Sequence, residues 1–430
     1  MPSDSHAPTH PQQREPAVLF GLVPHGDVRE TSTLLAELVR LSHTCGFEIV
    51  GQLTQHRRSP DQNHYMGAGK LEELHELIES SGAKVAICND TLTPGQGRNV
   101  GQILKVPTID RSELILTIFD THAQTPQAKL QVELASLEYQ LPRLKRLWTH
   151  LERQRGGIGM RGGAGEKQID LDRNALRSRI SQVNRRLKLI ETRKIRMVAQ
   201  RTEQFTIALV GYTNAGKSTL MNQLTDAGVL AQDRLFSTLD TRTKPWRLQG
   251  GRTVLLSDTV GFIQDLPHQL VASFHATLEE ALNADLLLLV TDASDPEALS
   301  QTAVVENVLE TLGAGHIPRI YILNKVDALD DQTMLMPLYQ HASKAVPVSA
   351  KTGLGMADLE TALLGHLAEF EETVDILVPH TGGALRAEIR TLTTVLSEDY
   401  SEEGSLMRIV ANPRLLGRLL AKGAQHTNPD

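Results

Sequence analysis

The chain has 430 residues, and its 40% of hydrophobic and 22% of charged residues argue against a broadly disordered protein. Its formal net charge of −7 argues against a protein that coats nucleic acid along its whole surface. Two cysteines exclude a disulfide framework and a four-cysteine zinc site, and the longest apolar runs are far shorter than the roughly 20 residues of a membrane helix.

The first 16 residues are rich in Pro, His and Gln and contain no apolar run. We therefore predict a disordered tail over 1–16 rather than a secretory signal. The small number of cysteines favours a cytoplasmic protein, with transient membrane association of part of the population as the alternative.

Residues 17–125 alternate short apolar runs with stretches of helical spacing, which predicts a small α/β domain. The expected strands are AVLFGLV, FEIVGQL, KVAICND and KVPTID, and KLEELHELIES is the helix between the second and third. The GAGK sequence at that helix predicts an ordinary turn, because a phosphate-binding loop needs more residues at fixed spacing. An ATP site in this domain is the weaker alternative.

Two heptad repeats predict an antiparallel helical hairpin over 126–203. Pro142 lies within the first repeat and should kink its helix. The repeats place residues at Leu130, Leu134, Leu137, Leu141, Leu144, Trp148 and Leu151, and then at Leu176, Ile180, Val183, Leu187, Ile190, Lys194 and Met197. Six glycines within 156–165 break the helix between the repeats and predict a glycine-rich tip.

Positive charge is concentrated in this hairpin. Residues 143–201 contain 17 Lys and Arg but only 5 Asp and Glu, a net charge of +12, so the rest of the chain carries −19. A solvated coiled coil would balance its basic residues with Glu, and this segment does not. The imbalance favours binding to nucleic acid, and the scarcity of aromatic residues favours phosphate contacts with folded RNA over base stacking.

A phosphate-binding loop is predicted where the apolar run TIALV meets GYTNAGKS, since GxxxxGK[ST] lies here between a strand and a helix. Backbone N–H groups and the helix N-terminus would surround the phosphates. Lys217 would place its charge at the β- and γ-phosphates, and Ser218 would ligate Mg²⁺. The loop comprises Gly211, Tyr212, Thr213, Asn214, Ala215, Gly216, Lys217 and Ser218.

Four further segments follow in the order typical of a GTPase, and their shared order makes a chance match improbable. Thr238 is expected to ligate Mg²⁺, Asp258 to act through a metal-bound water, and the Gly261 N–H to meet the γ-phosphate. Asp327 can accept two hydrogen bonds from guanine, which adenine cannot donate. The segments are Phe236, Ser237, Thr238, Leu239 and Asp240; Asp258, Thr259, Val260 and Gly261; Asn324, Lys325, Val326 and Asp327; and Ser349, Ala350 and Lys351.

We therefore predict a GTP hydrolase with Lys217, Thr238 and Gly261 as catalytic residues and with Ser218 and Thr238 as metal ligands. Many GTPases have a Gln after the glycine of DxxG to orient the attacking water, but this chain has Phe262 there. An apolar ring cannot bind a water, so intrinsic hydrolysis should be slow and a partner should complete the site.

At this point the chain resembles the HflX family of ribosome-associated GTPases. The resemblance rests on QAKLQVELASLEYQLPRL, GGIGMRGGAGE, QIDLDR, FSTLD and DTVGF. It implies a hairpin that docks on the large ribosomal subunit and its RNA, a tip that reaches toward the peptidyl transferase centre, and GTP-dependent splitting or rescue of stalled ribosomes. The chain departs from the family pattern at RGGAGEK, where RGPGE followed by Thr is usual, and at TPQAKLQ, where an acid–glycine pair usually precedes the Lys.

The predicted fold class is α/β, with a mostly parallel GTPase sheet over 204–370 and a small α/β domain over 371–430. The last segment reads as strand, helix, strand and helix, with no chemical motif. The simplest expected state is a monomer, because the two hairpin repeats can pair with each other. The same motifs are compatible with two alternative functions. One is a GTPase of ribosome assembly or tRNA modification, and the other is a nucleotide-gated RNA-binding scaffold with negligible turnover.

Overall fold

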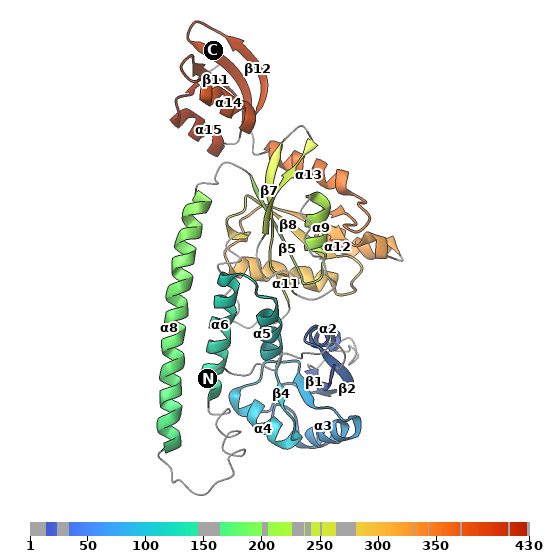
Figure 1. Ribbon diagram of the computed structural model, residues 1–430. Coiled ribbons are helices and arrows are strands. Elements are labelled where there is room, and N and C mark those ends of the chain that lie inside the picture. The colour runs from blue at the N-terminus through green and yellow to red at the C-terminus, as the bar shows by residue number, and fades with distance from the viewer. Residues whose placement is uncertain are drawn as a thin grey trace. The chain divides into compact units, whose positions relative to one another are not determined.

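The computed structural model describes residues 14–23, 34–144, 164–199, 205–225, 236, 242–249, 252–263, 281–329, 331–342, 344–369, 372–411 and 413–427. These residues form three sheets, each with its own hydrophobic core, and a helical hairpin (Figure 1). The chain divides into two compact units. The first comprises Met1–Thr192, Leu230–Asp240 and Val260–Leu278, and the second comprises Arg193–Val229, Thr241–Thr259 and Glu279–Asp430. The predicted α/β fold class is confirmed.

The N-terminal domain is a parallel sheet with strand order β2-β1-β3-β4. Its elements are β1 (Glu15–Val23), α2 (Ala36–Thr44), β2 (Phe47–His56), α3 (Ala68–Ser81), β3 (Val85–Cys88), α4 (Pro94–Leu104), β4 (Thr108–Ile109) and α5 (Arg111–His122). The central strand β1 has a continuous apolar run because helices in a parallel sheet cover both of its faces. It begins at Glu15, two residues before the start predicted for this domain.

Helices α4 and α5 are absent from the expected elements, although both carry capping signals. Thr93 and Gln96 form a capping box at α4, and Asp110 caps α5 by accepting a hydrogen bond from the Glu113 N–H at 2.9 Å. The GAGK sequence behaves as an ordinary helix start, with Gly67 as the N-cap of α3 in extended conformation. Three glycines interrupt the helical pattern of α4, and the apolar residues of α5 include the consecutive Leu114, Ile115 and Leu116, which do not follow a helical spacing.

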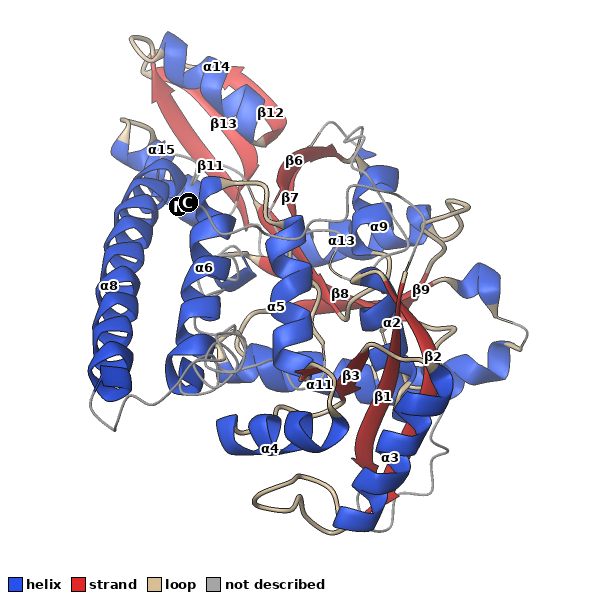
Figure 2. Cartoon of the chain, turned by 60° about the horizontal axis from the view of Figure 1, so that its bottom comes forward, coloured by secondary structure: helices blue, strands red, loops and turns tan. Residues whose placement is uncertain are grey.

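The hairpin pairs α6 (Pro126–Gln140) with α8 (Ala164–Ala199), which lie side by side in Figures 1 and 2. Their contact is made by the predicted repeat positions Leu130, Leu134, Leu137, Ile180, Val183 and Leu187. The first helix passes into the 3₁₀ turn η1 (Leu141–Arg143) at Pro142, which lacks the N–H that an α-helix needs. Trp148, Leu151 and most of the predicted glycine tip lie outside the described residues.

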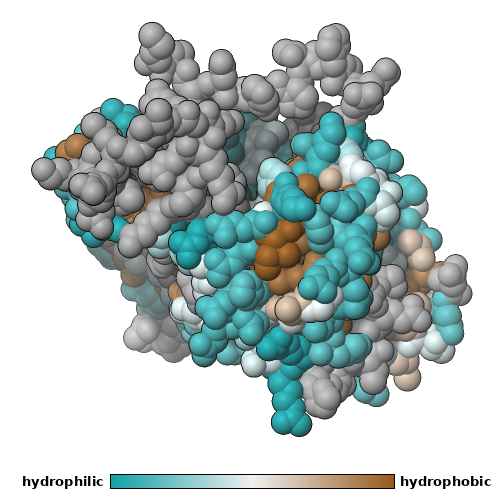
Figure 3. All heavy atoms as spheres, turned by 90° about the horizontal axis from the view of Figure 1, so that it is seen from below, coloured by the Kyte–Doolittle hydropathy of each residue, from teal (hydrophilic) through white to brown (hydrophobic). Residues whose placement is uncertain are grey.

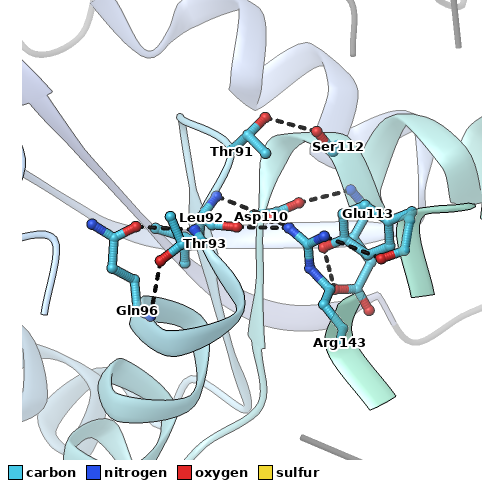
Figure 4. Close-up of polar contacts among 9 residues, drawn as sticks. Thr91, Leu92, Thr93, Gln96, Asp110, Ser112, Glu113 and Arg143 are labelled. Atoms are coloured by element: carbon cyan, nitrogen blue, oxygen red, sulfur yellow. Dashed lines mark hydrogen bonds and ion pairs between the residues drawn. The ribbon is translucent and has the colours of Figure 1, made fainter. Parts of the chain in front are cut away.

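Arg143 anchors the end of this first helix to the N-terminal domain (Figure 4). Its guanidinium donates to Asp110 Oδ2 at 3.2 Å and to the Leu92 carbonyl at 2.6 Å, and it lies 3.6 Å from the centre of the Tyr139 ring. Asp110 is at the same time the cap of α5. Arg143 belongs to the basic segment 143–201, but its guanidinium is half-buried and paired with Asp110 inside the protein.

The GTPase domain is a six-stranded sheet with strand order β10-β9-β8-β5-β7-β6, parallel except for the antiparallel edge pair β6 and β7. Its elements are β5 (Thr206–Gly211), α9 (Lys217–Leu224), β6 (Arg242–Arg247), β7 (Thr253–Asp258), β8 (Leu286–Asp292), α11 (Ala298–Thr311), β9 (Arg319–Asn324), η3 (Val326–Ala328), η4 (Gln332–Leu335), α12 (Met336–His341), β10 (Val346–Pro347) and α13 (Met356–Glu369). Parallel strands end at one edge of a sheet, which brings together the loops that follow β5, β7, β8, β9 and β10.

The C-terminal domain differs from the expected order of strand, helix, strand and helix. It contains β11 (Glu372–Pro379), α14 (Gly383–Leu392), β12 (Thr394–Tyr400), β13 (Gly404–Ala411), α15 (Pro413–Ala421) and β14 (Gln425–His426), in an antiparallel sheet of order β12-β13-β11-β14. The expected long helix stops at Leu392, and the β-branched residues after it form an additional strand. Apolar residues of β11 and β13 pack with α14 and α15 to form the core.

Among the residues that the structure describes, no helix combines the length and apolar composition needed to span a membrane. Among the coloured residues of the face shown in Figure 3, hydrophilic ones predominate, and a small hydrophobic patch lies near the centre of the view.

Candidate nucleotide-binding site

The loop between β5 and α9 turns sharply because three of its residues have left-handed backbone conformations. Gly211, Asn214 and Gly216 have φ values of 153°, 62° and 91°. A Cβ at Gly211 would collide with the Val290 carbonyl oxygen, and one at Gly216 would collide with the side-chain nitrogen of Asn324. The loop therefore lies close against neighbouring strands, and its geometry suits the wrapping of backbone N–H groups around phosphate oxygens.

Lys217 and Ser218 begin helix α9, and both side chains are buried. The Lys217 ammonium donates to the carbonyls of Gly211 at 3.0 Å and of Tyr212 at 2.8 Å. Burial lowers the pKa of Lys217 to about 8, and the nearby negative charge of Asp258 opposes that shift. Its hydrogen bonds to described residues go to carbonyls, so a buried ammonium of this kind would gain from an incoming phosphate.

Asp258 ends β7 directly beside the phosphate loop, because β7 pairs with β5 at Leu209. Its carboxylate is fully buried, and its Oδ2 accepts a hydrogen bond from Ser218 Oγ at 2.7 Å. The adjacent Thr259 donates its hydroxyl to the Leu209 carbonyl at 2.6 Å. This places a hydroxyl and a carboxylate side by side, the type of oxygen ligands that suits Mg²⁺.

The segments predicted for guanine recognition meet at Asn324, which ends β9. Its side-chain amide donates to the Ala215 carbonyl at 2.8 Å and accepts from the Ala350 N–H at 3.0 Å. Ser349 donates to Asp327 Oδ1 at 2.6 Å. These contacts join three predicted segments at one end of the sheet, and the phosphate loop among them lies more than a hundred residues before the other two.

Two of the predicted residues have other surroundings. The Lys325 ammonium forms an ion pair with the Asp292 carboxylate at 2.6 Å. Lys351 is exposed in the turn that precedes α13. Phe236 is the only described residue of its segment, and it lies against Phe119 of α5. Ser237, Thr238, Leu239 and Asp240 lie outside the described residues.

Sequence reasoning missed Asp292, which ends the apolar strand β8 and holds Lys325. Its position at the carboxyl end of an apolar run was the available signal, since the other predicted acids occupy equivalent positions. Phe262 is only 2% exposed, which agrees with an apolar side chain that has no role in binding a water.

Three family models match consecutive parts of the chain. Residues 32–120 match a family described as GTP-binding GTPase N-terminal, 122–201 match GTP-binding GTPase Middle Region, and 206–325 match 50S ribosome-binding GTPase. The hairpin thus coincides with a region that recurs in other proteins between the two α/β domains.

Proteins of similar sequence extend over nearly the whole chain. The GTPase HflX of Magnetococcus marinus is 42% identical over 413 residues, covering 96% of this chain and 95% of that protein. The GTPase HflX of Escherichia coli is 40% identical over 391 residues, covering 90% of this chain and 92% of that protein. Among solved structures, a GTP-binding protein of Sulfolobus solfataricus in complex with GDP is 25% identical, with coverage of 82% and 98% and a TM-score of 0.43.

Proposed function

Because the chain belongs to the HflX family of GTPases, we propose that it binds the large ribosomal subunit and hydrolyses GTP in a cycle that the ribosome stimulates. Family membership makes the chain an enzyme that converts GTP and water to GDP and phosphate. The observation that carries the ribosome proposal is the match of residues 206–325 to the family described as 50S ribosome-binding GTPase.

The charge of helix α8 supports RNA as the docking surface. The helix contains ten Lys and Arg but only four Asp and Glu. Exposed cations on its described surface are Arg177, Arg185, Arg186 and Lys188, whereas Arg179 is paired with Glu133. Unpaired surface cations in such a density suit the phosphates of folded RNA.

The nucleotide site supports GTP hydrolysis with Mg²⁺. Ser218 and Thr238 would hold the ion, which would neutralise charge on the β- and γ-phosphates, and Asp258 would orient its water ligands. Lys217 would leave its two carbonyl partners for the phosphates, and the Gly261 N–H would contact the γ-phosphate. Asp327 would accept hydrogen bonds from the guanine N1–H and N2–H₂ groups. The Ser349 hydroxyl, which donates to Asp327 Oδ1, would hold the carboxylate in position.

Phe262 supports the idea that the ribosome completes the site. A buried apolar ring directly after Gly261 cannot orient a water, so a group from the partner must do so. GTP would order the switch segments and favour docking, and hydrolysis would favour release. We further propose that this cycle splits or rescues stalled ribosomes in the cytoplasm.

Two alternatives share the same nucleotide site. A GTPase of ribosome assembly or tRNA modification would respond to an RNA other than the mature large subunit. A scaffold with negligible turnover would bind GTP without accelerated hydrolysis on any RNA.

GTP turnover by the purified protein, alone and with isolated large ribosomal subunits, tests the proposal. We expect slow turnover alone, strong stimulation by the subunits, and no turnover of ATP. The double variant Arg185→Ala/Arg186→Ala should lose the stimulation and keep the basal rate, whereas Lys344→Ala, which removes an exposed cation of the GTPase domain, should keep both. Fast turnover without ribosomes and no stimulation by them would contradict the proposal.

A further inference from the structure

The hydroxyl of Thr213 is a buried polar group without a partner. Thr213 is only 6% exposed, and its Oγ1 makes no hydrogen bond to any described residue. Burying an unpaired hydroxyl destabilises the folded protein, and a Val of the same shape would avoid that cost. A hydrogen-bond partner for this hydroxyl must therefore come from outside the described residues.

The backbone gives no reason for a Thr at this position. The left-handed residues of the loop are Gly211, Asn214 and Gly216, and Thr213 lies outside that set. Many side chains would thus fit the local conformation, and the presence of a hydroxyl calls for a chemical explanation.

The position within the loop points to phosphate as the missing partner. Thr213 directly follows Tyr212, whose carbonyl holds the Lys217 ammonium at 2.8 Å. A loop of this type would wrap around the β- and γ-phosphates, which would bring phosphate oxygens within reach of a donor buried in it. A hydroxyl can donate one hydrogen bond to such an oxygen.

We propose that Thr213 Oγ1 donates a hydrogen bond to a γ-phosphate oxygen of bound GTP, and that this contact makes the site prefer GTP over GDP. This inference goes beyond the ribosome proposal, and it rests only on the GTPase activity of the family.

The test compares the affinities of a non-hydrolysable GTP analogue and of GDP in the full chain without ribosomes. Thr213→Val should weaken the analogue by about tenfold, the value of one hydrogen bond to a charged group, and should leave GDP affinity unchanged within about twofold. Thr213→Ser keeps the hydroxyl and should restore the preference for the analogue. Thr213→Ala provides a second hydroxyl-free variant if the Val variant does not fold.

Thr225→Val is a matched control. Thr225 is equally buried, lies at the other end of α9, and donates its hydroxyl to the Met221 carbonyl at 2.7 Å. This control should leave the preference between the two nucleotides unchanged. Equal losses for both nucleotides in Thr213→Val, or no loss for either, would overturn the inference, and neither result would bear on stimulation by ribosomes.

Discussion

The ring of Phe236 packs against the ring of Phe119, with centroids 4.5 Å apart and planes inclined at 60°. Phe119 is fully buried in α5 of the N-terminal domain, and Phe236 is 2% exposed. Phe236 also has a positive φ of 58°, which is strained for a bulky side chain. The first residue of the predicted switch segment is therefore held in a strained conformation by an aromatic contact.

Weakening this contact should change how the protein binds GTP. The variant Phe119→Leu loses an aromatic pair worth about 0.5–1.5 kcal/mol and frees Phe236 to leave its strained conformation. We expect about threefold to tenfold tighter binding of a GTP analogue, measured by titration calorimetry.

Phe20→Leu serves as the control, since Phe20 is also fully buried in the N-terminal domain. Its ring packs edge-on against the ring of Tyr65, with centroids 6.0 Å apart. It should lower stability without changing nucleotide affinity. Equal analogue affinities for the wild type and Phe119→Leu would show that the contact has no influence on the nucleotide state.

Lys217 should make nucleotide affinity depend on pH. Its pKa is lowered by burial to about 8 in the nucleotide-free protein, and phosphate favours the charged form, so binding takes up protons near that pH. The ammonium is charged below this pKa and loses its charge as pH rises through it. GDP affinity should therefore be about threefold to fourfold lower at pH 8.5 than at pH 7.

Titration calorimetry in buffers of different ionisation enthalpy would detect the proton uptake directly. Lys217→Arg, whose side chain stays charged over this range, should remove the pH dependence even if its affinity is lower. A flat pH profile for the wild type would contradict the lowered pKa.

Removing Arg143 should destabilise the hairpin anchor. Arg143→Met leaves the Asp110 carboxylate buried without its charged partner, which costs about 3 kcal/mol in a typical buried pair. The measurement is chemical denaturation of the full chain. The double variant Arg143→Met/Asp110→Asn should cost less than the sum of the two single variants, because the second change removes the stranded charge.

The comparison variant is Arg408→Met, which removes one partner of the exposed Arg408–Asp375 pair on neighbouring strands. Its denaturation midpoint should stay close to that of the wild type, because solvent screens an exposed pair. Similar losses in the two variants would mean that the buried position of Arg143 has no special importance.

Asp327 should determine the choice of base. Asp327→Asn replaces an acceptor of two guanine hydrogens with a side chain that also donates, so GDP affinity should fall by more than about tenfold. Xanthosine diphosphate offers a carbonyl where guanine has an amino group, and it should bind the variant better than GDP does. A competition assay with both nucleotides would decide, and unchanged GDP preference would exclude Asp327 as the base-recognising residue.

Local sequence signals predict much of this fold because some elements are encoded by contiguous residues. The apolar run TIALV and the motif after it predict β5 and α9, and the leucine spacing predicts the contact between α6 and α8. Strand β12 was missed because helix α14 leads into it with only one intervening residue, and apolar residues continue through both.

Contacts between distant segments could not be predicted in the same way. Arg143 pairs with Asp110, and Lys325 pairs with Asp292, across 33 residues of chain in each case. Local spacing carries no information about which of several acids a basic residue meets. For the predicted nucleotide site, the order of the motifs suggests which segments come together, but the hydrogen bonds of the Asn324 amide that join them depend on the fold.

We expect the Asn324 amide to make recognition of the base and of the phosphates interdependent. One side of the amide holds the carbonyl of Ala215 in the phosphate loop, and the other holds the N–H of Ala350. Guanosine and pyrophosphate should consequently bind cooperatively even as separate molecules, since each orders a loop attached to the same amide. The protein would then bind an intact nucleotide much more tightly than either of its parts, and free phosphate in the cell would compete poorly for the loop.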